Sequence, residues 1–340
     1  MAVLSVGVVL LVVFGVLGAA VPVPYVAQVP GPTFNTLGEV DGEPIISVEG
    51  RERNETEGEL TLTTVGVSRA GLSLVEAVQG WFDGEVSVVP EETVYPPGRS
   101  EQETRDANRQ AFLTSEEAAE VAALAELGYP VKVVVRGLSD DSPAEGELLE
   151  GDAIESVGGR PTPDLATLDA VLQSIPGGTT VPVAYTRLGR PGTATVTTRA
   201  ADDEEGSLLG VLVREQPAAP YDVDIAVEDV GGPSAGLMLT LGILDLVGDT
   251  DLTGGATVAG TGTITATGEV GPIGGIQLKM IAAEGIGAEL FLVPADNCAE
   301  AVSTAPDDLR LVKVESLAGA VTALDDLREG RDDRLPACAD

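Results

Sequence analysis

The residues of this chain best suited to chemistry are one serine and one lysine. Ser234 lies in the stretch Gly-Gly-Pro-Ser-Ala-Gly at positions 231–236, where glycines let backbone and substrate approach closely. Within it, G-x-S-x-G is a pattern in which serine acts as a nucleophile. The chain contains no histidine, so Ser234 needs another base, and lysine is the known alternative. Without a base, Ser234 would only cap the helix that follows.

Lys279 is the lysine whose surroundings suit that role. It lies in the apolar run at positions 276–283, and the chain has only two other lysines, Lys132 and Lys313. A solvated lysine is charged, with a pKa of about 10.4, but burial disfavours the charged form and lowers the pKa. A neutral amine can take the serine proton. The alternative is a surface lysine whose stem covers an amphipathic helix.

The two residues, their spacing and the sequence between them resemble those of a known protease family. Lys279 follows Ser234 by 45 positions, and between them lies the glycine-rich run Thr267–Gly275. From about Val223 to Val321 the sequence resembles the proteolytic domain of Lon-type serine–lysine proteases. This resemblance implies that Ser234 is the nucleophile and that Lys279 is its general base.

The same resemblance implies one supporting residue and shows one departure. Thr261 matches a threonine of the family that hydrogen-bonds the lysine. Many Lon proteases have an acidic residue three positions before the serine, where this chain has Gly231. The role of that acid is then absent or is taken by Glu228 or Asp229.

The elements that must position these residues follow a β/α pattern after the acidic break at positions 202–206. We predict a Lon-type domain over residues 207–335. Its expected elements are a strand at 223–227, a buried helix at 234–247, strands within 256–266, a helix at 276–284, a strand at 290–293, a helix near 295–304, a strand at 309–314 and a helix at 316–327.

Residues 129–201 have a logic of their own. A strand at 131–135 precedes the runs D-S-P-A, G-D-x-I and V-x-G-x, and a helix near 165–175 follows, with Asp164 as its cap. In this order the runs resemble a PDZ domain of the bacterial protease-associated type. That resemblance implies binding of an extended peptide, often a C-terminus, as an added strand beside a helix. The alternative is a small β-rich domain without a ligand.

Residues 23–128 read as a β-rich region followed by a helix. Apolar and polar residues alternate over 40–66, residues 90–108 suggest a loop, and Ser115 is expected to cap a helix that runs to about Leu127. A Lon-type domain usually has strands and a helix well before its serine. If this region supplies them, the PDZ-like segment is an insertion, and residues 58–127 should pack on residues 220–330.

The N-terminus and the cysteines indicate the compartment. Residues 2–21 are uncharged and nearly all apolar, and twenty helical residues span about 30 Å of bilayer. A signal peptide would have a basic start and a shorter apolar core, so we favour an uncleaved transmembrane anchor over residues 1–22. Cys298 and Cys338 read as a disulfide of an exported domain, the alternative being two unrelated thiols. Both signals predict a single-pass cell-membrane protein with its catalytic body outside the cytoplasm.

Composition limits the partners. The 340 residues are 44% apolar and carry a net charge of −36, which argues against nucleic acid. No G-x-x-x-x-G-K-[ST] run is present, and we expect no ATPase motor, cofactor or metal in this sequence. A homo-oligomer is left open.

The order of anchor, PDZ-like segment and Lon-like domain resembles the membrane-anchored PDZ–Lon-like proteases of Gram-positive bacteria. We therefore expect an α/β (α+β) Lon-type domain, a PDZ-like β-rich domain and one transmembrane helix. The expected function is ATP-independent, membrane-tethered serine endopeptidase activity on protein or peptide substrates. The alternative is a non-catalytic, membrane-tethered peptide-binding adaptor; a Ser–Lys signal peptidase fits the spacing less well.

Overall fold

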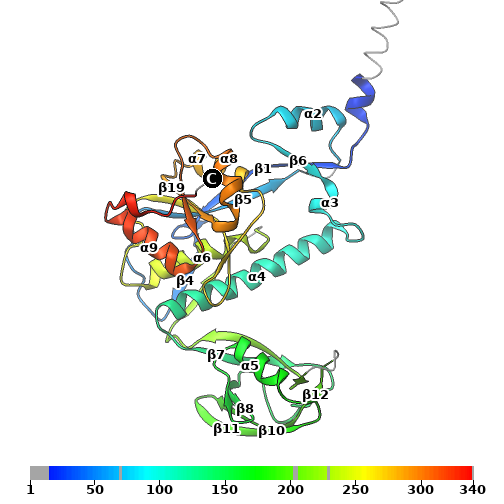
Figure 1. Ribbon diagram of the computed structural model, residues 1–340, viewed down its shortest axis with the longest axis vertical. Helices are drawn as coiled ribbons and strands as arrows, with labels where there is room; N and C mark the ends of the chain where they lie inside the picture. The colour runs from blue at the N-terminus through cyan, green and yellow to red at the C-terminus, as the bar shows by residue number, and fades with distance from the viewer. Residues whose placement is uncertain (1–14, 69–70, 202–205, 228–229, 339–340) are drawn as a thin grey trace, which may run out of the picture. The chain divides into compact units, whose positions relative to one another are not determined.

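The chain forms two compact units, one inserted in the other. The computed structural model describes residues 15–68, 71–201, 206–227 and 230–338. The first unit joins Met1–Ala123 to Tyr221–Asp340, and the second is Leu124–Pro220. We call the first the protease unit and the second, after the resemblance of its motifs, the PDZ-like unit (Figure 1).

One six-stranded sheet holds the protease unit together. Its order is β20-β19-β16-β5-β1-β6. The strands are β1 (Tyr25–Asn35), β5 (Glu59–Val67), β6 (Ser87–Pro90), β16 (Thr257–Gly260), β19 (Leu290–Pro294) and β20 (Arg310–Val314). Strand β5 pairs antiparallel with β1 and parallel with β16. Strand β5, which precedes the PDZ-like unit in the sequence, therefore pairs with β16, which follows that unit.

Two helices of the protease unit bury apolar residues against this sheet. Helix α6 (Gly236–Val247) is buried at every position and contacts β5 and β16, while α7 (Ile276–Gly285) contacts β1 and β5. The remaining elements are β2 (Glu39–Val40), β3 (Glu43–Pro44), β4 (Ile46–Glu49), α2 (Leu74–Phe82), α3 (Glu91–Val94), α4 (Glu101–Glu126), β15 (Asp222–Ile225), η1 (Pro233–Ala235), β17 (Thr263–Ile264), β18 (Val270–Gly271), η2 (Ala295–Asn297), α8 (Cys298–Thr304), α9 (Leu317–Arg328) and η3 (Asp332–Arg334).

Helix α4 corrects the predicted helix start. We expected a loop over 90–108 and a helix beginning at Ser115, but the helix runs from Glu101. Ser100 and Glu103 form the reciprocal cap: the Ser100 Oγ accepts from the Glu103 N–H, and a Glu103 carboxylate oxygen accepts from the Ser100 N–H. Ser115 is instead 4% exposed in mid-helix.

The PDZ-like unit is a sheet with one helix beside it. The strand order is β11-β10-β8-β7-β14, with β9 paired to β8. The elements are β7 (Val131–Leu138), β8 (Ala153–Val157), β9 (Arg160–Pro161), α5 (Leu165–Gln173), β10 (Thr180–Arg187), β11 (Arg190–Thr197), β12 (Arg199–Ala200), β13 (Ser207–Leu208) and β14 (Val211–Pro217). Its core is made of aliphatic side chains from these strands, from α5 and from the loops between them.

The boundary of this unit differs from the predicted one. We placed residues from 207 onward in the Lon-type domain, yet β14 pairs antiparallel with β7 along its whole length. The acidic run that suggested a linker precedes β13 and β14, so it falls inside the unit; its residues 202–205 lie outside the described ranges.

The predicted transmembrane anchor over residues 1–22 lies mostly outside the described residues, which begin at position 15. Residues 15–20 are helical. Within the described ranges, no helix combines the length and the apolar character that crossing a membrane requires.

Candidate active site

Ser234 lies at a turn that the sequence shapes for exposure of its hydroxyl. Gly232 has a φ of 85°, a conformation that favours glycine, and Pro233 then begins the 3-10 turn η1 that leads into α6. Gly236 is needed for packing, since a Cβ there would lie 2.6 Å from Oγ of Ser115. The first N–H groups of a helix have no intrahelical acceptor, so this turn presents donors beside the Ser234 hydroxyl.

The structure brings Lys279 to Ser234. The Lys279 Nζ lies 2.7 Å from the Ser234 Oγ, and the lysine is 3% exposed in α7. Burial lowers the pKa of Lys279 from 10.5 to about 7. Burial is the cause of this shift among the residues that the structure describes, and it favours the neutral, basic form of the amine.

Thr261 fixes the direction of the amine. The Thr261 hydroxyl donates to the Ser234 carbonyl oxygen at 3.0 Å, and its oxygen accepts from the Lys279 Nζ at 2.9 Å. Because the Thr261 hydrogen is already used, the amine must be the donor in that second bond. The lone pair of a neutral Lys279 is then free to face the Ser234 hydroxyl.

Three residues that support the site were not predicted from the sequence. The Ser115 hydroxyl donates to the Pro233 carbonyl at 3.0 Å, and the Asn108 carbonyl accepts from the Gly232 N–H at 2.8 Å, so α4 holds the nucleophile turn. Buried Asn297 exchanges two hydrogen bonds of 2.9 Å with the backbone of Ile273 and fixes the loop before α7. The sequence pointed to Ser115 only as an expected helix cap, and no motif pointed to Asn108 or Asn297.

The structure does not describe the two residues that could take the role of the family's acidic residue before the serine. Glu228 and Asp229 lie outside the described residues. The two cysteines are joined as a disulfide, Cys298–Cys338, with the Cα atoms 5.1 Å apart. The disulfide links the start of α8 to the C-terminal tail, next to Asn297 but not at the serine.

Cavities flank Ser234 on two sides. One of about 400 Å³ is lined by residues 62–67 of β5 together with Val230, Gly231 and Lys279. The other, of about 450 Å³, is lined by Pro233, Thr263 and residues 272–274. Both cavities therefore leave open space next to the serine.

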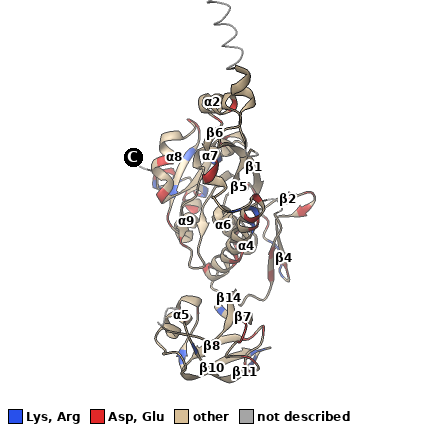
Figure 2. Ribbon diagram, turned by 90° about the vertical axis from the view of Figure 1, so that its right-hand side faces the viewer, with Lys and Arg blue, Asp and Glu red and all other residues tan. Residues whose placement is uncertain are grey.

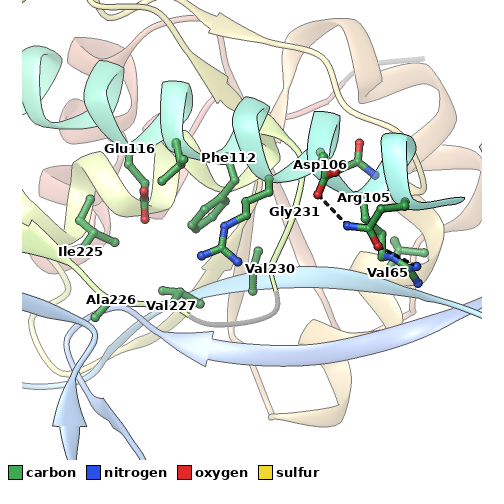
Figure 3. A pocket seen from close by; sticks show the side chains of 14 residues that line it. Val65, Arg105, Asp106, Phe112, Glu116, Ile225, Ala226, Val227, Val230 and Gly231 are labelled. Carbon is green, nitrogen blue, oxygen red and sulfur yellow. Dashed lines mark hydrogen bonds between the residues drawn. The ribbon is translucent and has the colours of Figure 1, made fainter. Parts of the chain in front are cut away.

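A larger cavity, about 840 Å³, extends the first one along α4 and shares Val65, Val230 and Gly231 with it (Figure 3). Glu116 points into it from α4. Burial raises the pKa of Glu116 to about 7; repulsion from Asp224 adds to the shift and Arg109 opposes it. This carboxyl, in the lining of the cavity, is therefore expected to exchange its proton near neutral pH.

Comparison with known proteins gives the class of enzyme. Residues 224–324 match the Lon protease (S16) C-terminal proteolytic domain, which spans the turn of Ser234, Thr261 and the helix of Lys279. This match indicates serine peptidase activity for the chain. No curated protein matches it.

Solved structures similar to the chain include bacterial PDZ domains. The PDZ domain of an SdrC-like protein from Listeria monocytogenes is 24% identical, with a TM-score of 0.23, over 24% of this chain and 86% of that one. The corresponding domain from Listeria innocua is 25% identical, with a TM-score of 0.23, over 24% of this chain and 93% of that one. A solution structure from Geobacillus thermodenitrificans is 23% identical, with a TM-score of 0.22, over 24% and 94% of the two chains.

Proposed function

We propose that this serine peptidase is an ATP-independent, membrane-tethered endopeptidase in which Ser234 is the nucleophile and Lys279 the general base. The observation that carries the proposal is the 2.7 Å separation of Lys279 Nζ and Ser234 Oγ with the amine buried. A hydroxyl held beside a neutral amine is the arrangement that nucleophilic catalysis without histidine requires.

In the proposed mechanism, Lys279 carries the proton both when the acyl-enzyme forms and when water hydrolyses it. Lys279 takes the Ser234 proton as Oγ attacks the peptide carbonyl carbon, and the oxyanion meets N–H donors of the η1 turn. The resulting ammonium gives its proton to the leaving amine, which leaves an ester on Ser234. Lys279 next takes a proton from water, the hydroxide attacks the ester, and the proton returns to Ser234 as the acid product departs. Thr261 acts as a positioning residue that holds the amine.

The substrate backbone has an edge to bind. Among the described residues, β5 pairs with β16 only over positions 59–62, so positions 63–67 have a strand neighbour on the β1 side alone. These same positions line the cavity beside Ser234. An extended substrate strand can pair with this edge, and the cavities on both sides of the serine support cleavage within a chain.

The PDZ-like unit supports recognition of peptides. Strand β14 ends its sheet and pairs with β7 alone among the described strands. Helix α5 lies beside it, and the Leu165 N–H at the helix start donates to the Glu215 carboxylate at 2.9 Å. An edge strand next to a helix is the arrangement to which an extended peptide adds as a further strand.

Two features of the sequence and one of the structure support the proposed ATP independence, membrane tethering and compartment. The absence of a phosphate-binding G-x-x-x-x-G-K-[ST] run supports ATP independence. The uncharged apolar segment 2–21 supports tethering to a membrane. The disulfide Cys298–Cys338 supports a catalytic body in an oxidising compartment. Cleavage of the body by protease added outside intact cells would test the last of these, and resistance in intact cells would contradict it.

A serine-directed covalent probe tests the catalytic assignment. We expect labelling of the wild-type chain at pH 7.5, no labelling of Ser234→Ala, and at least about 10³-fold slower labelling of Lys279→Met. Lys313→Met, which alters a half-buried lysine paired with Glu315, is the matched control and should label like wild type. ATP should not change the hydrolysis of an unfolded protein. Equal labelling of all variants, or labelling of none, would favour the peptide-binding adaptor instead.

A further inference from the structure

Helix α2 turns its large apolar side chains to solvent. Leu74, Val75, Val78, Trp81 and Phe82 recur at spacings that place them on one side of the helix, and we call them the α2 face. They are between 38% and 88% exposed, and Phe82 and Trp81 are the most exposed of the five. A contiguous apolar face of this kind on a soluble body marks a surface that another phase or molecule covers.

The helix is attached to the protease unit by its small residues. Ala77 and Gly80 are its buried positions, and a Cβ on Gly80 would lie 2.6 Å from the Val88 side chain of β6. Trp81 also touches Tyr25 of β1, edge to face, with ring centroids 5.9 Å apart. Trp81 thus helps the small residues to hold α2, and the α2 face as a whole stays largely exposed to solvent and available for a partner.

The α2 face lies where the apolar N-terminal segment joins the body. Pro22 and Ser73 form a β-bridge, and the Val23 N–H donates to the Leu72 carbonyl at 2.8 Å. A Cβ on Gly18 would lie 3.4 Å from Cγ2 of Val75, so the helical residues 15–20 run past the start of α2. Figure 2 shows the two helices side by side at one end of the protease unit.

We propose that helix α2 lies in the interfacial layer of a lipid bilayer, with the α2 face directed into the acyl chains. The inference rests on the membrane tethering proposed above. An amphipathic helix in this layer buries its apolar face by about 5–10 Å. Tryptophan and phenylalanine are side chains that this layer favours.

The charged residues around the α2 face indicate which lipid headgroups it can contact. Glu76, Asp83 and Glu85 adjoin the α2 face, and the helix has no basic residue. Anionic headgroups would be repelled, so the contact depends on apolar burial rather than on electrostatic attraction. The occupant we commit to is therefore a zwitterionic lipid surface. A second copy of this chain is the alternative that the experiment must separate.

Trp81 is the only tryptophan of the chain and reports on this contact directly. The full chain is reconstituted in phosphatidylcholine vesicles, with a fraction of the lipid brominated either near the headgroup or near the chain end. We expect a blue-shifted Trp81 emission and about a twofold loss of its intensity with shallow bromine, and a smaller loss with deep bromine. Raising the salt concentration should leave the quenching unchanged.

Matched variants assign the effect to the α2 face. Phe82→Asp and Val78→Asp should abolish most of the quenching. Leu188→Asp, which places the same charge at a 96% exposed leucine of the PDZ-like unit, should leave it intact. Serine-probe labelling in detergent should be the same for all three variants, because none touches the site; a variant that labels less is replaced by Phe82→Ser.

Flotation of the vesicles separates the two proposals. A chain that floats with the vesicles but whose Trp81 is not quenched overturns the α2 inference and leaves tethering intact. A chain that does not float overturns both. A Trp81 emission that is blue-shifted in detergent, depends on protein concentration and does not respond to brominated lipid assigns the face to a second copy and also overturns the inference.

Discussion

Burial of Lys279 suits it to the proposed role of general base, but the same burial costs folding free energy. Lys279 is 3% exposed, and burial of its amine disfavours the charged form in the folded chain. Within the described part of the chain, the amine contacts the hydroxyls of Ser234 and Thr261. Both the activity and the stability of the chain should therefore follow the protonation of this one group.

The first prediction concerns activity. With the pKa of Lys279 at about 7, the neutral fraction increases about tenfold per pH unit below that value and saturates above it. The second-order rate of serine-probe labelling should follow the same curve and level off near pH 8. A rate that keeps rising to pH 10 would mean that the amine is solvated.

The second prediction concerns stability. Between pH 7 and 10.5 the unfolded chain binds a proton at Lys279 that the folded chain does not, so this residue lowers stability progressively as the pH falls through that window. Lys279→Met should raise the free energy of unfolding by on the order of 1–3 kcal/mol at pH 7, and by little near pH 11. Denaturant titrations at both pH values, with Lys313→Met as control, measure it. A loss of stability at pH 7 would show that the hydrogen bonds outweigh the desolvation.

At the scale of elements, the sequence and the structure agree where a helix or strand is defined by apolar burial. The helix at 276–284 and the strand at 290–293 were predicted within a residue or two of α7 and β19. The predicted start of α4 was wrong. Serine is a residue type that often caps helices, but the Ser115 hydroxyl donates to the Pro233 carbonyl instead. That partner is 118 positions away, and no local pattern contains it.

Strand pairing was harder to predict than strand position. Residues 211–217 alternate like any half-buried strand, and nothing in them shows that β7 rather than the protease sheet is the partner. The same holds for the site. The residue types of Ser234, Lys279 and Thr261 could be read from motifs, but Asn297 acts through the backbone of Ile273 and has no motif of its own.

The third prediction tests the G-D-x-I run of the PDZ-like unit. Asp152 is fully buried, and its carboxylate accepts from Arg187 at 2.6 and 2.7 Å and from the Leu149 N–H at 2.8 Å. Burial raises its pKa, but these hydrogen bonds outweigh burial and hold the pKa below the ordinary 3.8. The stabilisation is present above that value and is lost as the pH falls through the lower folded value.

Asp152→Asn should therefore destabilise the PDZ-like unit by about 2–4 kcal/mol at pH 7, because Arg187 loses its charged partner. Hydrogen exchange of the β8 and β10 amides measures it, with Asp169→Asn on the exposed side of α5 as control. Unchanged protection in Asp152→Asn would mean that the pair contributes nothing to folding.

The fourth prediction concerns the disulfide. Cys298 and Cys338 close a loop of 40 positions, for which the chain-entropy model gives about 4 kcal/mol at most. Cys338→Ser should lower the unfolding midpoint of the protease unit, and reductant should do the same to the wild-type chain but not to the variant. Midpoints that reductant leaves unchanged in both would contradict a structural role.

At the scale of the whole molecule, charge is the dominant property. A net charge of −36 creates a field that attracts cationic chains and repels acidic ones. As a fifth prediction, a lysine-rich unfolded peptide should be cleaved several-fold faster than a glutamate-rich peptide of the same cleavage sequence at about 20 mM salt, and the difference should shrink near 0.5 M. A ratio that salt does not change would place the preference in the site itself.

The order of the strands in the sheet also determines when, during synthesis of the chain, the site can form. Thr63 and the carbonyl of Gly260 are hydrogen-bonded across 197 positions, because β16 inserts beside β5. A nascent chain that has emerged as far as Ser234 has neither this strand nor Lys279. Ser234 and Lys279 can therefore meet only after the chain has been made beyond position 279.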